Sequence, residues 1–188
     1  MELMPTPSQT VGPFFHVAYP LTGSTEMVAR NDPDAVVISG TVFDGDGAPA
    51  PDALLEFWQA NRAGRYAHPE DERQDVPLED GFDGFGRCAT DDEGHYEFVT
   101  VKPGRVPGPG GGLQAPHIAV SVFARGLLKR VVTRIYWPDE PEANSSDPIL
   151  SSIEDPRARE TLIARPVDGG LRFDIRLQGE GETVFFDI

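Results

Sequence analysis

Turn-forming residues divide this chain into short apolar runs, and this pattern constrains the fold more than any other feature. The 188 residues include 20 glycines and 18 prolines, which fall between the apolar runs. Short runs rich in β-branched and aromatic residues are typical of strands, whereas helices need longer stretches without such breaks. We therefore expect an all-β protein, an antiparallel β-sandwich with long loops and one short helix.

Local composition places the expected elements. The segments with the composition of strands are residues 36–44, 53–60, 96–101, 117–125, 130–137, 171–177 and 183–186. The helix is expected at residues 156–164, where Asp155 can cap the first turn and Pro156 suits the first position. Residues 66–86 and 102–115 form two long loops, and loops of this length often carry function.

The N-terminal segment differs from the rest of the chain. Residues 6–16 contain two prolines and a glycine, which exclude a regular helix, yet their valine and phenylalanines are too apolar for a free tail. An extended arm laid against another surface satisfies both observations. Within a single domain, residues 1–188, we therefore expect an arm and lead-in over residues 1–35 and a β-sandwich over residues 36–188.

Charge and cysteine content limit the partners and the compartment. The formal net charge of -15 repels phosphate backbones and anionic membranes, so nucleic acid and lipid surfaces are poor partners. An anionic ligand would need local cations to overcome this field. The single cysteine, Cys88, cannot form an internal disulfide, and no segment has the features of a signal peptide or a membrane span. We expect a cytoplasmic protein.

Several polar side chains have both a structural and a functional interpretation. His117 and Ala119 share one face of an expected strand, but a lone strand histidine is more often a hydrogen-bonded core residue than a ligand. Tyr66 offers ferric iron a hard oxygen ligand, or simply packs its ring. Arg125 can bind a carboxylate bidentately or form a surface ion pair, and for Arg134 we expect the surface ion pair.

Long and specific segments carry a resemblance that extends over nearly the whole chain. They are residues 6–14, 55–60 (LEFWQA), 85–87, 100–104, 115–118, 123–126, 159–164 and 173–187 (FDIRLQGEGETVFFD). Together they resemble the intradiol ring-cleaving dioxygenases, and within that family the alpha chains of its two-chain enzymes. The resemblance implies a prealbumin-like topology for the sandwich.

The resemblance also implies that this chain lacks a full iron site. Catalytic chains of the family hold a ferric ion with two tyrosines and two histidines. This chain keeps Tyr66 and His117, but Val106 and Ala119 stand at the positions of the second tyrosine and the second histidine. Gln114 stands where catalytic chains have an arginine. The resemblance therefore implies vestigial iron-site positions here, no metal bound by this chain, and Fe(III) in a partner beta chain of similar fold.

The implied role is to complete the partner's active site. By position, the arm residues Thr10, Gly12 and Pro13 and the strand-end residue Arg125 would line the partner's substrate pocket. The implied reaction inserts O2 into 3,4-dihydroxybenzoate to give 3-carboxy-cis,cis-muconate, a step of aromatic catabolism in the beta-ketoadipate pathway. The chain alone would be inactive, because it would orient the substrate without holding the metal.

Two alternatives remain open at this point. A self-sufficient ferric dioxygenase would need replacement donors such as His68 or Tyr96. A non-enzymatic binding module would fit the turn patterns of residues 40–47 and 90–96, which resemble transthyretin-like domains. Such modules would leave the N-terminal arm and residues 159–187 unexplained.

Overall fold

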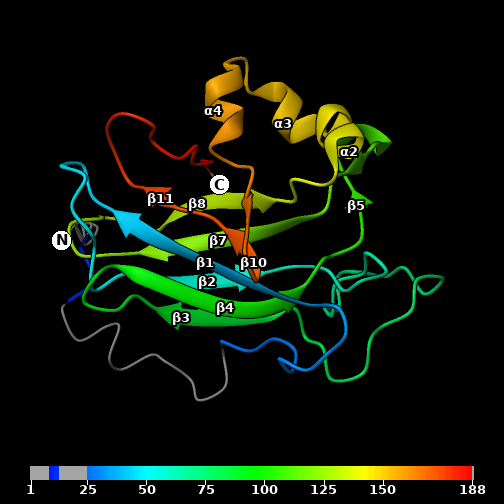
Figure 1. Cartoon of the computed structure of the whole chain (residues 1–188). Helices are drawn as coiled ribbons and strands as arrows, with labels where there is room; N and C mark the ends of the chain where they lie inside the picture. Colours follow the sequence, from blue (N-terminus) through cyan, green and yellow to red (C-terminus); the bar gives the residue numbers. More distant parts are fainter. Residues whose placement is uncertain (1–8, 13–24, 188) are drawn as a thin grey trace, which may run out of the picture.

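Residues 9–12 and 25–187, which the computed structural model describes, fold into three β-sheets and a group of short helices (Figure 1). The longest strand, β1 (Ala35–Phe43), lies in a five-stranded sheet and takes part in three of its four strand pairings. It pairs antiparallel with β4 (His95–Val101) and parallel with β10 (Gly170–Arg172) and β11 (Ile175–Arg176). A short strand, β9 (Arg165–Val167), extends the sheet beside β10.

The second large sheet is wholly antiparallel. Its order is β3 (Phe85–Ala89), β2 (Leu54–Trp58), β7 (His117–Phe123) and β8 (Val131–Tyr136). The third sheet is a small hairpin of β5 (Val106–Pro107) and β6 (Leu113–Gln114). None of the sheets in the described part of the chain closes into a barrel.

One hydrophobic core joins the two large sheets. Its members include Ile38 from β1, Phe57 from β2, Phe98 from β4 and Val120 from β7, all fully buried. The rings of Phe57 and Phe98 come from different sheets and stack with their centroids 3.7 Å apart. Burying a side chain of this size stabilises a fold by about 1.5–3 kcal/mol, so these contacts hold the two sheets together.

The core also contains Cys88 on β3. Burial raises the pKa of its thiol to about 12, with a backbone hydrogen bond opposing the shift. The side chain is therefore a neutral, inert thiol at physiological pH.

The helices cover the end of the molecule near the β5–β6 hairpin (Figure 1). They are α2 (Pro141–Ser146), α3 (Pro148–Ser152) and α4 (Pro156–Glu160), and each begins with a proline, whose missing amide hydrogen costs nothing there. A second, smaller core of Ala115, Tyr136, Ala143, Leu150 and Leu162 lies beneath them. In residues 9–12 and 25–187, no helix has both the length and the apolar sequence needed to cross a bilayer.

The expectation of a mostly β protein is confirmed, and the segments expected as strands at residues 117–125 and 130–137 form β7 and β8, which pair antiparallel. Two features of the expected sandwich are wrong. The first is the antiparallel sheet, because β1 runs parallel to both β10 and β11. The second is the single helix, because three α-helices and a 3-10 turn (Pro109–Gly111) are present in the described residues, and α4 ends at Glu160 rather than at residue 164.

The C-terminal strands also differ from the prediction. Residues 171–177 divide into β10 and β11, because the Asp174 carboxylate accepts a 3.0 Å hydrogen bond from the Thr41 amide in place of a backbone carbonyl. Residues 183–186 form no strand, and only Phe186 makes an isolated bridge, to Val132. The sequence analysis missed β3 and β9, and it treated the β5–β6 hairpin as part of a loop.

Candidate functional site

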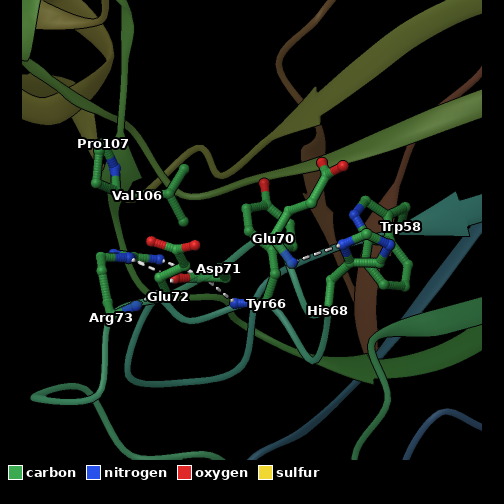
Figure 2. Close-up of a pocket in the computed structure, with 9 residues that line it drawn as sticks. All are labelled: Trp58, Tyr66, His68, Glu70, Asp71, Glu72, Arg73, Val106 and Pro107. Carbon is green, nitrogen blue, oxygen red and sulfur yellow. Dashed lines mark hydrogen bonds and ion pairs between the residues drawn. The ribbon is translucent and has the colours of Figure 1, made fainter.

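A pocket with a volume of about 740 Å³ opens beside the end of β2 (Figure 2). Its wall is formed by β2, by the loop that follows it and by β5. The lining residues are Trp58, Tyr66, His68, Glu70, Asp71, Glu72, Arg73, Val106 and Pro107. The structure therefore brings together Tyr66 and Val106, two of the positions that the sequence analysis assigned to a vestigial iron site.

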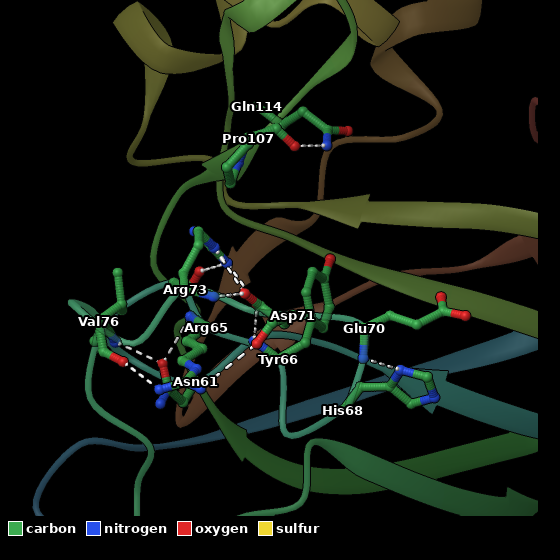
Figure 3. A network of polar contacts seen from close by, with 12 residues as sticks. Asn61, Arg65, Tyr66, His68, Glu70, Asp71, Arg73, Val76, Pro107 and Gln114 are labelled. Atoms are coloured by element: carbon green, nitrogen blue, oxygen red, sulfur yellow. Dashed lines mark hydrogen bonds and ion pairs between the residues drawn. The ribbon is translucent and has the colours of Figure 1, made fainter.

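A polar network fixes the loop that carries Tyr66 (Figure 3). The Asn61 side-chain oxygen accepts hydrogen bonds from the amides of Ala63 (3.1 Å) and Arg65 (2.9 Å). Asp71 accepts from the Tyr66 amide at 2.8 Å and from the Arg73 guanidinium at 2.6 and 2.8 Å. The hydrogen bonds from Arg73 are the largest cause that lowers the pKa of Asp71, so this carboxylate stays charged.

The Tyr66 ring lies flat against Trp58. The two centroids are 5.8 Å apart, and the planes differ by only 8°. Burial raises the pKa of the Tyr66 hydroxyl, while the charges of Arg134 and Arg73 partly offset the shift. At neutral pH the side chain is a protonated phenol, partly buried at the pocket wall.

His117 begins β7 and is buried at 5% exposure. Its Nδ1 lies 2.8 Å from the Ala115 carbonyl oxygen, so Nδ1 carries the proton and donates it there. Burial lowers the pKa of His117 to about 4, and the positive charge of Arg134 acts in the same direction. The imidazole is therefore neutral at physiological pH and packs 5.5 Å from the Tyr136 ring.

Ala119 lies outside the large pocket. It lines a neighbouring apolar hollow of about 340 Å³ together with Trp58 and His68. In the sheet it stands directly between Trp58 on β2 and Arg134 on β8. The position that the resemblance assigns to the second histidine thus carries a methyl group, between Trp58 and Arg134.

Gln114 links the small hairpin to the large sheet. It pairs with Val106 across the β5–β6 hairpin, and its side-chain nitrogen donates to the Pro107 carbonyl at 2.9 Å. Its side-chain oxygen accepts a 2.6 Å hydrogen bond from Arg134. The expectation of a surface ion pair for Arg134 is wrong, because no carboxylate in the described residues lies within ion-pair distance of it.

These residues do not fit a tightly held ferric ion. Of the four positions that the resemblance assigns to iron ligands, Tyr66 and His117 carry donor atoms, and Val106 and Ala119 do not. Ferric iron favours several anionic or imidazole donors together, and a nearby guanidinium opposes it. In residues 9–12 and 25–187, no group of three or more histidine, cysteine or acidic side chains could hold a metal ion.

The two proposed replacement donors differ in position. Tyr96 is buried in the core, where its hydroxyl donates a 2.5 Å hydrogen bond to the Phe173 carbonyl, so it does not reach the pocket. His68 does line the pocket, with its ring edge toward Trp58 at 6.2 Å. One exposed imidazole does not replace the two missing donors.

The second group of predicted residues lies at the far end of β7. The Thr10 hydroxyl accepts a 2.8 Å hydrogen bond from the Gly126 amide, and Gly126 has a φ of 89° that only glycine adopts easily. The neighbouring Arg125 pairs with Asp52, yet its side chain stays 58% exposed. Gly12 is exposed as well, and Pro13 lies outside the described residues.

The two groups are well separated. His117 is the first residue of β7, whereas Arg125 and Gly126 follow its last residue, Phe123. Six steps of about 3.3 Å make the strand about 20 Å long. The described piece of the arm, near the N label in Figure 1, therefore approaches the end opposite the pocket.

Comparisons with known proteins agree along nearly the whole chain. The profile of a family described as Dioxygenase matches residues 11–179. The alpha chain of protocatechuate 3,4-dioxygenase from Pseudomonas putida is 45% identical, and the match covers 100% of this chain and 98% of that protein. The beta chain of protocatechuate 3,4-dioxygenase from Burkholderia cepacia is 41% identical over 80% of this chain and 67% of that protein.

The fold is shared with a solved structure. It is the dioxygenase domain of a fusion of a dioxygenase with a carbohydrate-binding protein, from Streptomyces sp. SirexAA-E. It superposes with a TM-score of 0.60 at 30% identity, over 94% of this chain and 99% of that one.

Proposed function

This chain belongs to the intradiol ring-cleaving dioxygenase family, and from that premise we propose that it is the iron-free alpha subunit of a protocatechuate 3,4-dioxygenase. In this role it assembles with a beta chain of similar fold that carries Fe(III). The complex cleaves 3,4-dihydroxybenzoate with O2 to 3-carboxy-cis,cis-muconate. The metal supplies Lewis acidity toward the catechol, and this chain supplies shape and charge.

One observation carries the proposal: a chain that matches an alpha chain over its full length has side chains without donor atoms, Val106 and Ala119, at two positions that the resemblance assigns to iron ligands. Val106 lines the pocket together with Tyr66 (Figure 2). Ala119 stands two residues after His117 on the same face of β7. Neither side chain can bind a metal. The remaining phenol and neutral imidazole are too few for ferric iron, which supports a helper role.

The arm end of the molecule is the part that we assign to the partner's substrate pocket. Thr10, Gly12, Pro13 and Arg125 are the proposed contributors. The exposure of Arg125 supports this assignment, because its side chain stays 58% exposed although its Nε pairs with Asp52. A guanidinium there can bind the carboxylate of an aromatic acid against the overall charge of -15.

The domain organisation belongs to the same proposal. We assign residues 36–188 to an open sandwich of prealbumin-like topology, and residues 1–35 to an arm and lead-in. The single core that joins the two large sheets supports the sandwich. The contact of Thr10 with Gly126 supports an arm that runs along the surface.

Co-expression with candidate beta chains tests the proposed function. The purified complex should contain iron and consume O2 in the presence of 3,4-dihydroxybenzoate, while this chain purified alone should do neither. Visible absorption from tyrosinate bound to iron gives a second readout that is independent of turnover. Stoichiometric iron in the isolated chain, or the absence of any complex with a beta chain, would contradict the proposal.

A further inference from the structure

Arg134 lies beside two of the vestigial iron-site positions, Ala119 and Gln114. It lies directly across from Ala119 in the pairing of β7 with β8. Side chains opposite each other in an antiparallel pair have Cβ atoms about 5 Å apart. Ala119 has only a methyl group, so the Arg134 side chain can extend into space that a histidine at position 119 would partly fill.

The contacts of the guanidinium resemble those of a bound cation. Its Nη1 donates to the Gln114 side-chain oxygen at 2.6 Å and to the Tyr136 hydroxyl at 3.2 Å. The ring of Phe186 covers it, with the guanidinium carbon 5.7 Å from the ring centroid. Oxygen atoms and an aromatic face thus surround a positive charge that has no carboxylate beside it in the described residues.

Tyr136 connects Arg134 to a buried carboxylate. The Tyr136 hydroxyl lies 3.3 Å from Asp147, a carboxylate with 0% exposure. Asp147 is itself committed, because it accepts hydrogen bonds from the Ala115 amide at 2.7 Å and from Ile149 and Leu150 at 2.8 Å. The positive charge of Arg134 is therefore not neutralised by a direct ion pair. This charge lowers the pKa of both His117 and Tyr66.

We propose that Arg134 is the built-in cation of this site and that it excludes metal ions even when the two missing donors are supplied. The inference rests on the proposed function, in which the chain works without iron of its own. It adds that the loss of iron has two separate causes, a shortage of donors and a fixed positive charge. Each cause can be removed without the other.

The experiment compares donor variants with and without the charge. Val106→Tyr and Ala119→His together restore two donors, and Arg134→Gln removes the charge while keeping an amide that can bond to Gln114. Fe(III) is titrated into each purified chain, and metal content and the visible tyrosinate band are recorded. Arg130→Gln, which removes an exposed charge from the neighbouring loop, is the matched control.

The triple variant with Arg134→Gln should bind Fe(III) at least about tenfold more tightly than the donor pair alone, a difference of about 1.4 kcal/mol. The Arg130→Gln version should bind no better than the donor pair. Equal binding with Arg134 present or absent would overturn the inference, and so would no binding in either. Iron in the unmodified chain would instead overturn the proposed function.

A smaller change guards against misfolding of the Val106→Tyr variant. Ala119→His alone gives two histidines on one strand face with His117, and the partly exposed position tolerates a larger side chain. Zn²⁺ binding to this variant is measured by calorimetry with Arg134 and with Arg134→Gln. At least about tenfold tighter Zn²⁺ binding in the absence of the guanidinium supports the inference, and unchanged binding refutes it.

Discussion

Thr10 and Gly126 are 116 residues apart in the sequence, and the hydroxyl of the first accepts a 2.8 Å hydrogen bond from the amide of the second. This contact attaches the described piece of the arm to the loop after β7. Gly126 itself lies in an exposed turn, so the hydrogen bond lies at the surface rather than in the core. It fixes the position of residues that we assign to the partner's pocket.

Thr10→Val should weaken the attachment of the arm without changing the iron content of the complex. The valine has the same shape but cannot accept the hydrogen bond, which contributes about 0.5–1.5 kcal/mol. In the complex with a beta chain, we expect the KM for 3,4-dihydroxybenzoate to rise by roughly 2- to 10-fold at unchanged iron content. Thr10→Ser, which keeps the hydroxyl, should retain the original KM; equal effects from both variants would contradict this role.

Arg125→Ala should weaken the reaction of carboxylated substrates in particular. A hydrogen bond between a guanidinium and a carboxylate is worth about 1.5–3 kcal/mol, so kcat/KM should fall roughly 10- to 100-fold. Catechol, which lacks the carboxylate, should show a much smaller loss, and the iron content should not change. Arg130→Ala removes a nearby exposed charge and serves as the control; the same loss in that variant would mean that only the net charge matters.

Asp147→Ala should destabilise the fold more than removal of an exposed helix cap. Asp147 is fully buried, caps α3 and accepts a hydrogen bond from the Ala115 amide. Losing the cap and leaving a buried amide without its partner should lower the free energy of unfolding by about 2–4 kcal/mol. Asp155→Ala removes the exposed cap of α4 and should cost about 1 kcal/mol. Urea unfolding distinguishes the two, and equal costs would show that Asp147 acts only as a cap.

His117 should make the isolated chain sensitive to mild acid. Its pKa is about 4 in the folded chain and near the ordinary 6.5 in the unfolded chain, because burial and the Arg134 charge disfavour the protonated ring. As the pH falls, the unfolded state therefore binds the proton before the folded state does. The stability that the neutral His117 contributes is complete above pH 6.5 and decreases as the pH falls toward 4. The total loss is roughly 3 kcal/mol.

Unfolding curves between pH 7 and pH 4 measure this effect. His117→Gln should flatten the dependence on pH, whereas His95→Gln, at an exposed position beside Asp91, should leave it in place. A pH dependence that persists in the His117→Gln variant would assign the effect to other groups.

The sequence predicted most of β1, β2, β4, β7 and β8 because each has enough β-branched and aromatic residues to specify a strand. It could not predict the interruption between β10 and β11, which depends on a side chain reaching across to the Thr41 amide. It missed α2 and α3 because helices of six and five residues are too short to show a period. The signals of these helices in the sequence are Pro141 and Pro148 at their first positions and Asp147 at the cap of α3.

The candidate site was predictable where it depends on residue identity and not where it depends on direction. The absence of donors at Val106 and Ala119 follows from the letters of the sequence once the segments are aligned with the family. The position of Arg134 beside Ala119 and Gln114 does not follow from the letters of the sequence. Both faces of β8 are largely buried, and the sequence of this strand shows no clear alternation of apolar and polar residues. Only the register with β7 brings Arg134 across from Ala119.

The distance along β7 has a consequence for how such a subunit can change over time. Substitutions around Tyr66 change the end of β7 at His117. The proposed contribution to the partner's active site depends on the opposite end, near Arg125. Substitutions at the first end can therefore remove metal binding without changing the contacts at the second end. A subunit with this arrangement continues to contribute to the partner's active site after its own site has lost the metal.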